Sequence, residues 1–329
     1  MIDSIKLGFH CYLTSKQLEE WTMMTSTQYK PTSKISTKFQ TWIKFPYGSI
    51  HVKYYPQDRN NRPEPLLLFE MSLPKLVYGN NIQMIDSPSL AIQKAQEIIG
   101  QYFYIPSVDL TMGTLYRLDL CYNFQVGEQV SEWIRQLFKL EYPRRKTKPY
   151  YPTEGVQYYS KRASLSFYNK EDETKDPTAH GILRMEASWR DKNQIGKLVN
   201  KPLATIGDFS SDVTVVLLNK ELDRLGVNGQ SPDDPTAALR ILLKKKGLKW
   251  GFHLFGHLHA RQIASRKVLI KMGVSRQIIS RSQKKIKAAG LSMSIAENGV
   301  VLPKLVIDPK SIMGRDKTPM IYIGNGLDH

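Results

Sequence analysis

The stretch 160-SKRASLSFYNK-170 alternates between polar and apolar side chains. Successive side chains of an extended strand point to opposite faces, so Leu165 and Phe167 should lie together on one side. Tyr168 and Lys170 should then lie together on the other side. The pattern predicts a strand whose polar face carries a phenol and an ammonium group close to each other.

Three other stretches repeat this alternation with a carboxylate on the polar side. They are 67-LLFEMSL-73, 116-YRLDLCYNF-124 and 183-LRMEASWR-190. The carboxylates are those of Glu70, Asp119 and Glu186, and strict alternation puts Tyr116 with Leu118 on the apolar side of the second stretch. Acidic residues are depleted in strands, so three of them in this position suggest a function. If the strands share one sheet, the carboxylates could hold a hard divalent metal beside a tyrosine able to attack phosphate.

Composition and charge narrow the class of protein. The 329 residues carry a net charge of +17, with a pI near 9.6, and 41% of them are hydrophobic. A core of ordinary size and a polyanionic partner are therefore expected. Cys11 and Cys121 lie in apolar stretches, which favours buried free thiols in a reducing compartment. No stretch approaches the roughly 20 apolar residues of a membrane span, so we expect nucleic acid rather than membrane as the partner.

The order of the predicted elements indicates an α+β fold with two domains. We expect residues 1–205 to form a catalytic domain with a central antiparallel sheet and helices on one face. Residues 206–329 should form a smaller, mainly helical, basic domain. Between residues 240 and 290 there are fourteen Lys or Arg residues and no Asp or Glu.

Two predicted basic helices, at 263–272 and 275–289, are separated by Gly273 and Val274, which resembles a helix-turn-helix. The cations expected to contact DNA in the second helix are Arg276, Arg281, Lys284 and Lys285. A second DNA-contacting segment is predicted at 142-YPRRKTKPYY-151, where two prolines exclude a helix or a central strand. Its expected phosphate contacts are Arg144, Arg145, Lys146 and Lys148, interleaved with tyrosines suited to stacking.

Several of these stretches, taken in order, resemble a known family. They are the MID start, 69-FEMSLPKLVYGNN-81, 114-TLYRLDLCYNF-124, the stretch at 160–170 and 182-ILRMEASWR-190. Together they resemble the gene II replication initiators of filamentous phages and, more weakly, the rolling-circle initiators of staphylococcal plasmids. The resemblance covers about residues 1–190, and 274-VSRQIISRSQKKIKAAGLS-292 is similar to the basic helical segment of the family.

The resemblance implies an enzyme that nicks one strand of a phage or plasmid origin. Such an enzyme stays joined to the 5′ phosphate through a tyrosine and later rejoins the displaced strand. By motif match Tyr168 would be the nucleophile, and Lys170 would stabilise charge on the phosphate. Glu70, Asp119 and Glu186 would hold Mg²⁺ or Mn²⁺. The expected partners are double-stranded and single-stranded origin DNA, with a host helicase as a further candidate, in the cytoplasm of a bacterial host.

Alternative readings of the residues stay open. His257 and His259 form a His-hydrophobe-His motif. The same motif holds the metal in relaxases, so the protein could alternatively be a relaxase-like nuclease. Tyr158 and Tyr159 are rival nucleophiles, although they lack the Tyr-x-Lys pattern. A DNA-binding protein without chemistry, such as a repressor or packaging factor, would use the same sheet only as a scaffold.

Overall fold

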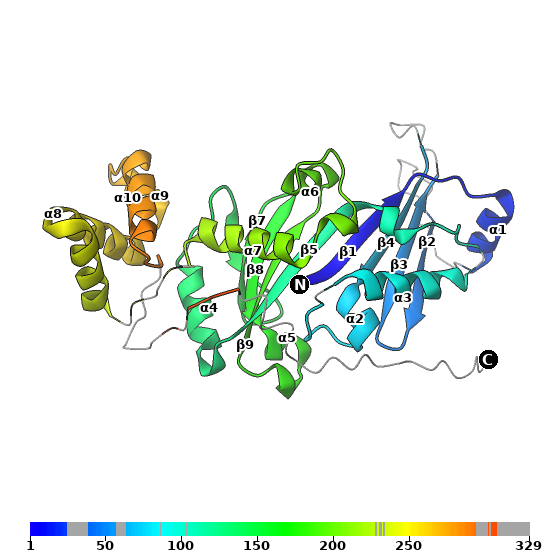
Figure 1. Ribbon diagram of the computed structural model, residues 1–329, viewed down its shortest axis with the longest axis horizontal. Coiled ribbons are helices and arrows are strands. Elements are labelled where there is room, and N and C mark those ends of the chain that lie inside the picture. Colours follow the sequence, from blue (N-terminus) through cyan, green and yellow to red (C-terminus); the bar gives the residue numbers. More distant parts are fainter. Residues whose placement is uncertain are drawn as a thin grey trace. The chain divides into compact units, whose positions relative to one another are not determined.

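The computed structural model describes residues 1–24, 39–56, 64–85, 87–102, 104–227, 229, 232, 234–293, 302 and 304–307 (Figure 1). Its described residues form two compact units. Unit 1 comprises residues 1–120 and 188–214, and unit 2 comprises residues 121–187 and 215–307. The domain boundary expected near residue 205 stays a prediction.

In the parts of the chain that the structure describes, nine strands form one antiparallel sheet. The strands are β1 (Ile2–Phe9), β2 (Phe39–Phe45), β3 (Gly48–Tyr55), β4 (Leu66–Ser72), β5 (Thr114–Gln125), β6 (Lys146–Pro149), β7 (Gly155–Tyr159), β8 (Ala163–Asn169) and β9 (Ile182–Trp189). Their order is β2-β3-β4-β1-β5-β9-β8-β7-β6. The four stretches that alternate in the sequence are β4, β5, β8 and β9. The expected α+β class, an antiparallel sheet with helices followed by a helical C-terminal region, is confirmed.

The helices are interspersed among the strands and then follow them. They are α1 (Ser15–Met24), α2 (Leu73–Tyr78), α3 (Ser89–Gly100), α4 (Val130–Phe138), α5 (Lys170–Thr174), α6 (Lys192–Leu198), α7 (Ser211–Leu225), α8 (Pro235–Ile263), α9 (Arg266–Lys271) and α10 (Arg276–Ala288). In the parts of the chain that are described, no helix has the length and apolar character needed to cross a bilayer.

In unit 1, β1 pairs with both carboxylate-bearing strands. Lys6 lies opposite Glu70 of β4 on one side and opposite Arg117 of β5 on the other. The alternate residues Ile5 and Leu7 are fully buried on the apolar face, and α2 packs against β1 and α3. Register therefore brings cationic and anionic side chains of three strands together on one face.

A β-bulge in β5 changes one of the face assignments. The register between β1 and β5 shifts so that Tyr116 is an extra residue on β5. Leu115, rather than Tyr116, is therefore buried with Leu118 on the apolar face. The ring of Tyr116 instead lies against Gly8, where an added Cβ would meet a ring carbon at 2.3 Å. The expectation that Tyr116 faces the core with Leu118 was wrong, because an inserted residue interrupts the alternation of the two faces and the sequence pattern does not reveal it.

In unit 2, α4 packs against β7 and β8. Trp133 and Leu137 of α4 are fully buried, as are Leu165 and Phe167 of β8, so the predicted apolar side of β8 faces the core. In the basic segment at 142–151, for which a helix and a central strand were excluded, residues 146–149 form the edge strand β6. An edge strand tolerates proline, since one row of its backbone groups makes no ladder hydrogen bonds.

The C-terminal part of unit 2 is helical, as predicted. Helix α8 is bent at Gly247, whose φ of 75° and ψ of 171° are not helical. Ser265 and Ser275 accept hydrogen bonds from the backbone N–H groups of the first turns of α9 and α10. Gly273, with a φ of 95°, makes the turn between these two helices, and α10 packs against α8.

Candidate active site

The hydroxyl of Tyr168 donates a hydrogen bond to the carboxylate of Glu186. The two atoms are 3.3 Å apart, and the residues come from the neighbouring strands β8 and β9. The ring of Tyr150 stacks on that of Tyr168, with centroids 4.7 Å apart and an interplanar angle of 9°. Tyr168 is therefore only 3% exposed, although it lies on the polar face of β8. This arrangement brings together the predicted nucleophile and a carboxylate that could take its proton.

Gly155 makes the tyrosine stack possible. It pairs with Tyr168 across β7 and β8, and its carbonyl accepts a hydrogen bond of 2.9 Å from the backbone N–H of Tyr150. A Cβ at this position would lie 2.7 Å from the Cβ of Tyr168 and 3.0 Å from that of Tyr150. The absence of a side chain at Gly155 therefore allows both tyrosines to approach the strand.

Lys170 lies near Tyr168, but as part of a helix. The strand ends at Asn169, whose side chain accepts hydrogen bonds from two backbone N–H groups of the first turn of α5. The ammonium group of Lys170 is fully buried, pairs with the carboxylate of Glu173, and lies 5.8 Å from the centroid of the Tyr168 ring. The charge of Lys170 is thus balanced locally in this conformation.

A further buried cation, Arg184, lies two residues before Glu186 on β9 and so on the same face of the strand. Its side chain is fully buried and donates to the side-chain oxygen of Asn123 at 3.1 Å. Alternation along residues 183–190 puts Arg184 on the side of Glu186, but the pattern assigns it no role. An arginine at the centre of a predicted strand could have revealed this residue, because a buried arginine needs polar partners.

The other two predicted acidic residues meet in unit 1 around Arg117. The guanidinium group of Arg117 lies 2.7 Å from Glu70 and 2.6 Å from Asp119, and Lys6 lies 2.8 Å from Glu70. Burial acts to raise the pKa of Glu70, but Lys6 and Arg117 hold that pKa below its usual value. Burial raises the pKa of Asp119, and Arg117 and Ser188 oppose this.

These carboxylates do not form a metal centre in the arrangement described. Their oxygen atoms suit Mg²⁺ or Mn²⁺, but the cation between Glu70 and Asp119 is the guanidinium group of Arg117. Among the residues that the structure describes, no three His, Cys, Asp or Glu side chains are grouped so that they could hold a metal ion. Metal binding by Glu70, Asp119 and Glu186 stays a prediction.

The rival tyrosines, Tyr158 and Tyr159, are held by contacts with groups other than a carboxylate. Tyr158 is fully buried and donates a short hydrogen bond to the carbonyl of Leu137, and burial raises its pKa well above the usual value. Tyr159 lies beneath Lys148, whose ammonium group is 4.9 Å from the ring centroid. Of the three tyrosines, only Tyr168 has a hydrogen bond to a carboxylate in the described structure.

The two histidines of the His-hydrophobe-His motif lie on α8. Side chains two positions apart on a helix do not face each other, and the intervening Leu258 is the buried one. Burial, with Arg261 and His253 nearby, lowers the pKa of His257 to about 4. His259 is exposed and stacks on Phe255. This helix does not bring the pair together as ligands of one metal.

The predicted DNA-contacting cations differ in their exposure. Arg145 is mostly buried: it pairs with Glu221 of α7 at 3.0 Å and lies over the ring of Tyr142 at 4.0 Å. It therefore joins the basic segment to α7. The remaining predicted contacts are exposed, apart from the half-buried Lys285: Arg144, Lys146, Lys148, Arg276, Arg281, Lys284 and Lys285.

Comparisons with known proteins identify the family. Residues 1–212 match the family described as the N-terminal region of the replication-associated gene II protein. Among solved structures, the chain is similar to a rolling circle replication initiator protein from Geobacillus stearothermophilus, with 12% identity, a TM-score of 0.35, and 78% of this chain and 94% of that chain covered. A similarity this low adds nothing to the assignment, and no curated protein matches. Because the family match spans all nine strands and 212 of the 329 residues, the chain belongs to the gene II replication initiators, which are nicking enzymes of rolling-circle replication.

Proposed function

We propose that this protein nicks and rejoins one strand of origin DNA through a covalent link to Tyr168. The observation that carries the proposal is the hydrogen bond from the Tyr168 hydroxyl to Glu186, in a chain of this family. Tyr158 and Tyr159 lack such a partner in the described structure, and a phenol needs a base nearby to become a good nucleophile at neutral pH.

The proposed reaction conserves the energy of the phosphodiester bond. Glu186 accepts the phenolic proton as the oxygen of Tyr168 attacks the phosphorus atom. The bond between phosphorus and the 3′ oxygen breaks, and the 3′ oxygen leaves as a hydroxyl after taking up a proton. The 5′ phosphate is then esterified to Tyr168. Attack by a 3′ hydroxyl on this ester reverses the step and joins the strand without ATP.

The buried cations near the tyrosine support this chemistry. Lys170 lies 5.8 Å from the ring of Tyr168, and Arg184 shares the face of β9 that carries Glu186. Positive groups held in a site with little water stabilise the negative charge that develops on a phosphate under attack. The ring of Tyr150 covers Tyr168, so a DNA strand that reaches the hydroxyl must displace part of this cover.

Mg²⁺ or Mn²⁺ belongs to the proposal as a predicted cofactor, with Glu70, Asp119 and Glu186 as predicted ligands. Such an ion would polarise the phosphate oxygens when bound. Arg117 would first have to leave its place between Glu70 and Asp119. No step above depends on the ion.

A suicide oligonucleotide tests the proposal. A single-stranded origin fragment with only a few nucleotides upstream of the cleavage site releases a short 5′ piece that carries the 3′ hydroxyl. Loss of this piece prevents rejoining, so the covalent adduct of the downstream piece accumulates. Wild-type protein should give an adduct that mass spectrometry maps to Tyr168, and Tyr168→Phe should give none while it still binds DNA. Tyr159→Phe is the matched control and should form the adduct normally. An adduct formed by Tyr168→Phe at the wild-type rate would disprove the assignment.

A further inference from the structure

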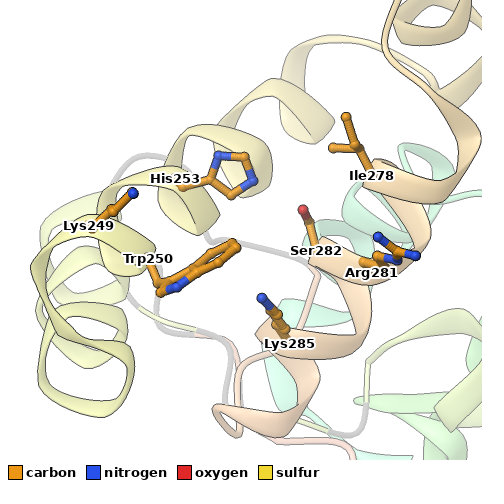
Figure 2. A pocket seen from close by; sticks show the side chains of 7 residues that line it. All are labelled: Lys249, Trp250, His253, Ile278, Arg281, Ser282 and Lys285. Atoms are coloured by element: carbon orange, nitrogen blue, oxygen red, sulfur yellow. The ribbon is translucent and has the colours of Figure 1, made fainter.

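A pocket of about 370 Å³ lies between α8 and α10, and no residue of the tyrosine site lines it (Figure 2). Both helices belong to unit 2 and pack against each other. The pocket is lined by Lys249, Trp250, His253, Ile278, Arg281, Ser282 and Lys285. Its volume falls within the range of about 300–1,000 Å³ that is usual for small-ligand sites.

The charged residues that line the pocket are all cationic. Lys249, Arg281 and Lys285 contribute three positive charges, and none of the seven lining residues is acidic. No described acidic residue forms an ion pair with any of the three, whereas Arg261, also on α8, has Glu141 at 3.8 Å. Three unneutralised cations around one hollow repel each other, so an anion placed among them should bind favourably.

An aromatic wall adds a second kind of contact. Trp250 is 49% exposed, and its ring is nearly perpendicular to that of His253, with centroids 5.6 Å apart. The ammonium group of Lys285 lies over the Trp250 ring, 3.3 Å from its centroid. A cation–π contact at a partly exposed site is weak. A phosphate can therefore draw Lys285 aside and leave the indole face open to a planar ring.

We propose that this pocket binds one unpaired nucleotide of single-stranded DNA, with the base stacked on Trp250 and the flanking phosphates held by Lys249, Arg281 and Lys285. An indole can stack only on a base whose face is open, which is true of single strands and not of an intact duplex. The inference extends the proposed function, because nicking and strand displacement produce such a strand. The pocket would hold that strand without any contribution from Tyr168.

The first test separates stacking from charge. Fluorescence anisotropy measures how the full-length protein binds a labelled 12-nucleotide oligo-dT and a 12-unit abasic oligonucleotide with the same phosphates. Trp250→Ala should weaken oligo-dT binding about tenfold, since stacking of one base is worth about 1–3 kcal/mol, and should leave abasic binding unchanged. The control is Trp42→Ala, which removes an indole of similar exposure, 47%, from β2 and should change neither affinity.

Two further variants guard against a folding defect. Trp250→Phe retains an aromatic face and should bind oligo-dT within about threefold of wild type, while Trp250→Leu retains an apolar side chain and should bind as weakly as Trp250→Ala. Equal affinities of the Phe and Leu variants, or a loss in Trp250→Ala that is the same for both oligonucleotides, would overturn the stacking contact.

Two adjacent lysines on α10 allow a controlled test of the charged contact. Lys285 lines the pocket, whereas the adjacent Lys284 is exposed and does not. Lys285→Gln should weaken oligo-dT binding and flatten the log–log salt dependence by about 0.7, the value for one phosphate contact with a single strand. Lys284→Gln should do so less. Equal effects of the two changes would mean that the pocket has no special role. Anisotropy measures binding without cleavage, so this test can be interpreted even if the nicking proposal fails.

Discussion

Arg117 is expected to hold together the acidic cluster of unit 1. Its guanidinium group contacts Asp119, which is 1% exposed, and Glu70, which also has Lys6. Arg117→Gln removes the positive charge and leaves Asp119 buried without a cation of its own. Breaking a buried ion pair in this way typically costs about 3–5 kcal/mol of unfolding free energy. We expect a loss of this size at pH 7, measured by urea denaturation of the two proteins in parallel.

The pH dependence of this loss follows from the carboxylates. Burial already raises the pKa of Asp119, and removing Arg117 raises it further, so the folded variant takes up a proton more readily than the unfolded chain. The destabilisation of Arg117→Gln should therefore be largest near neutral pH and shrink as the solution is acidified. In wild type the pKa of Glu70 is lowered below 4.5, so its contribution is present above that pH and is lost in more acidic solution.

Arg135→Gln provides the matched control. Arg135 is 51% exposed and pairs with Glu132 one turn away on α4, so its removal should cost no more than about 0.5 kcal/mol. If Arg117→Gln costs no more than Arg135→Gln at pH 7, or if its effect grows on acidification, Arg117 does not neutralise Asp119 in the way described.

Three further predictions concern the metal, the tyrosine stack and the histidines. Mn²⁺ should raise the melting temperature of wild type but not of Asp119→Asn, because a metal that binds the folded state stabilises it. Equal shifts in the two proteins would show that Asp119 is not a metal ligand. Gly155→Ala should cost about 1–3 kcal/mol of stability through crowding of the tyrosine stack and slow adduct formation, whereas Gly100→Ala, where nothing lies within 4 Å of an added Cβ, should do neither. Replacing His257 and His259 together by Ala should leave metal-dependent nicking intact, and its loss would favour the relaxase-like alternative.

Local alternation in the sequence was sufficient to predict the strands that carry the site. A period of two places Glu70, Arg117 and Asp119 on polar faces wherever their strands pair, because side-chain direction in a strand depends only on the backbone next to it. The same reasoning correctly placed Leu165 and Phe167 in the core. The basic helices of the C-terminal part were likewise predictable, because turn and capping residues act within a few positions of the chain.

The partners of these side chains were decided by tertiary structure alone. The bulge at Tyr116 exists only in the register of β5 with β1, and Arg117 meets Glu70 only because β1 lies between β4 and β5 and carries Lys6 between them. No local pattern contains this information, because the residues that meet are far apart in sequence.

The same holds for the candidate nucleophile. Alternation in the sequence is enough to place Tyr168 on the polar side of a strand. Tertiary structure decided that Tyr150 covers it, that Glu186 accepts its hydrogen bond, and that Tyr158 is committed to the core. Burial and hydrogen-bond partners depend on which strands become neighbours, and that choice is made by packing of the whole sheet rather than by any one stretch of the chain.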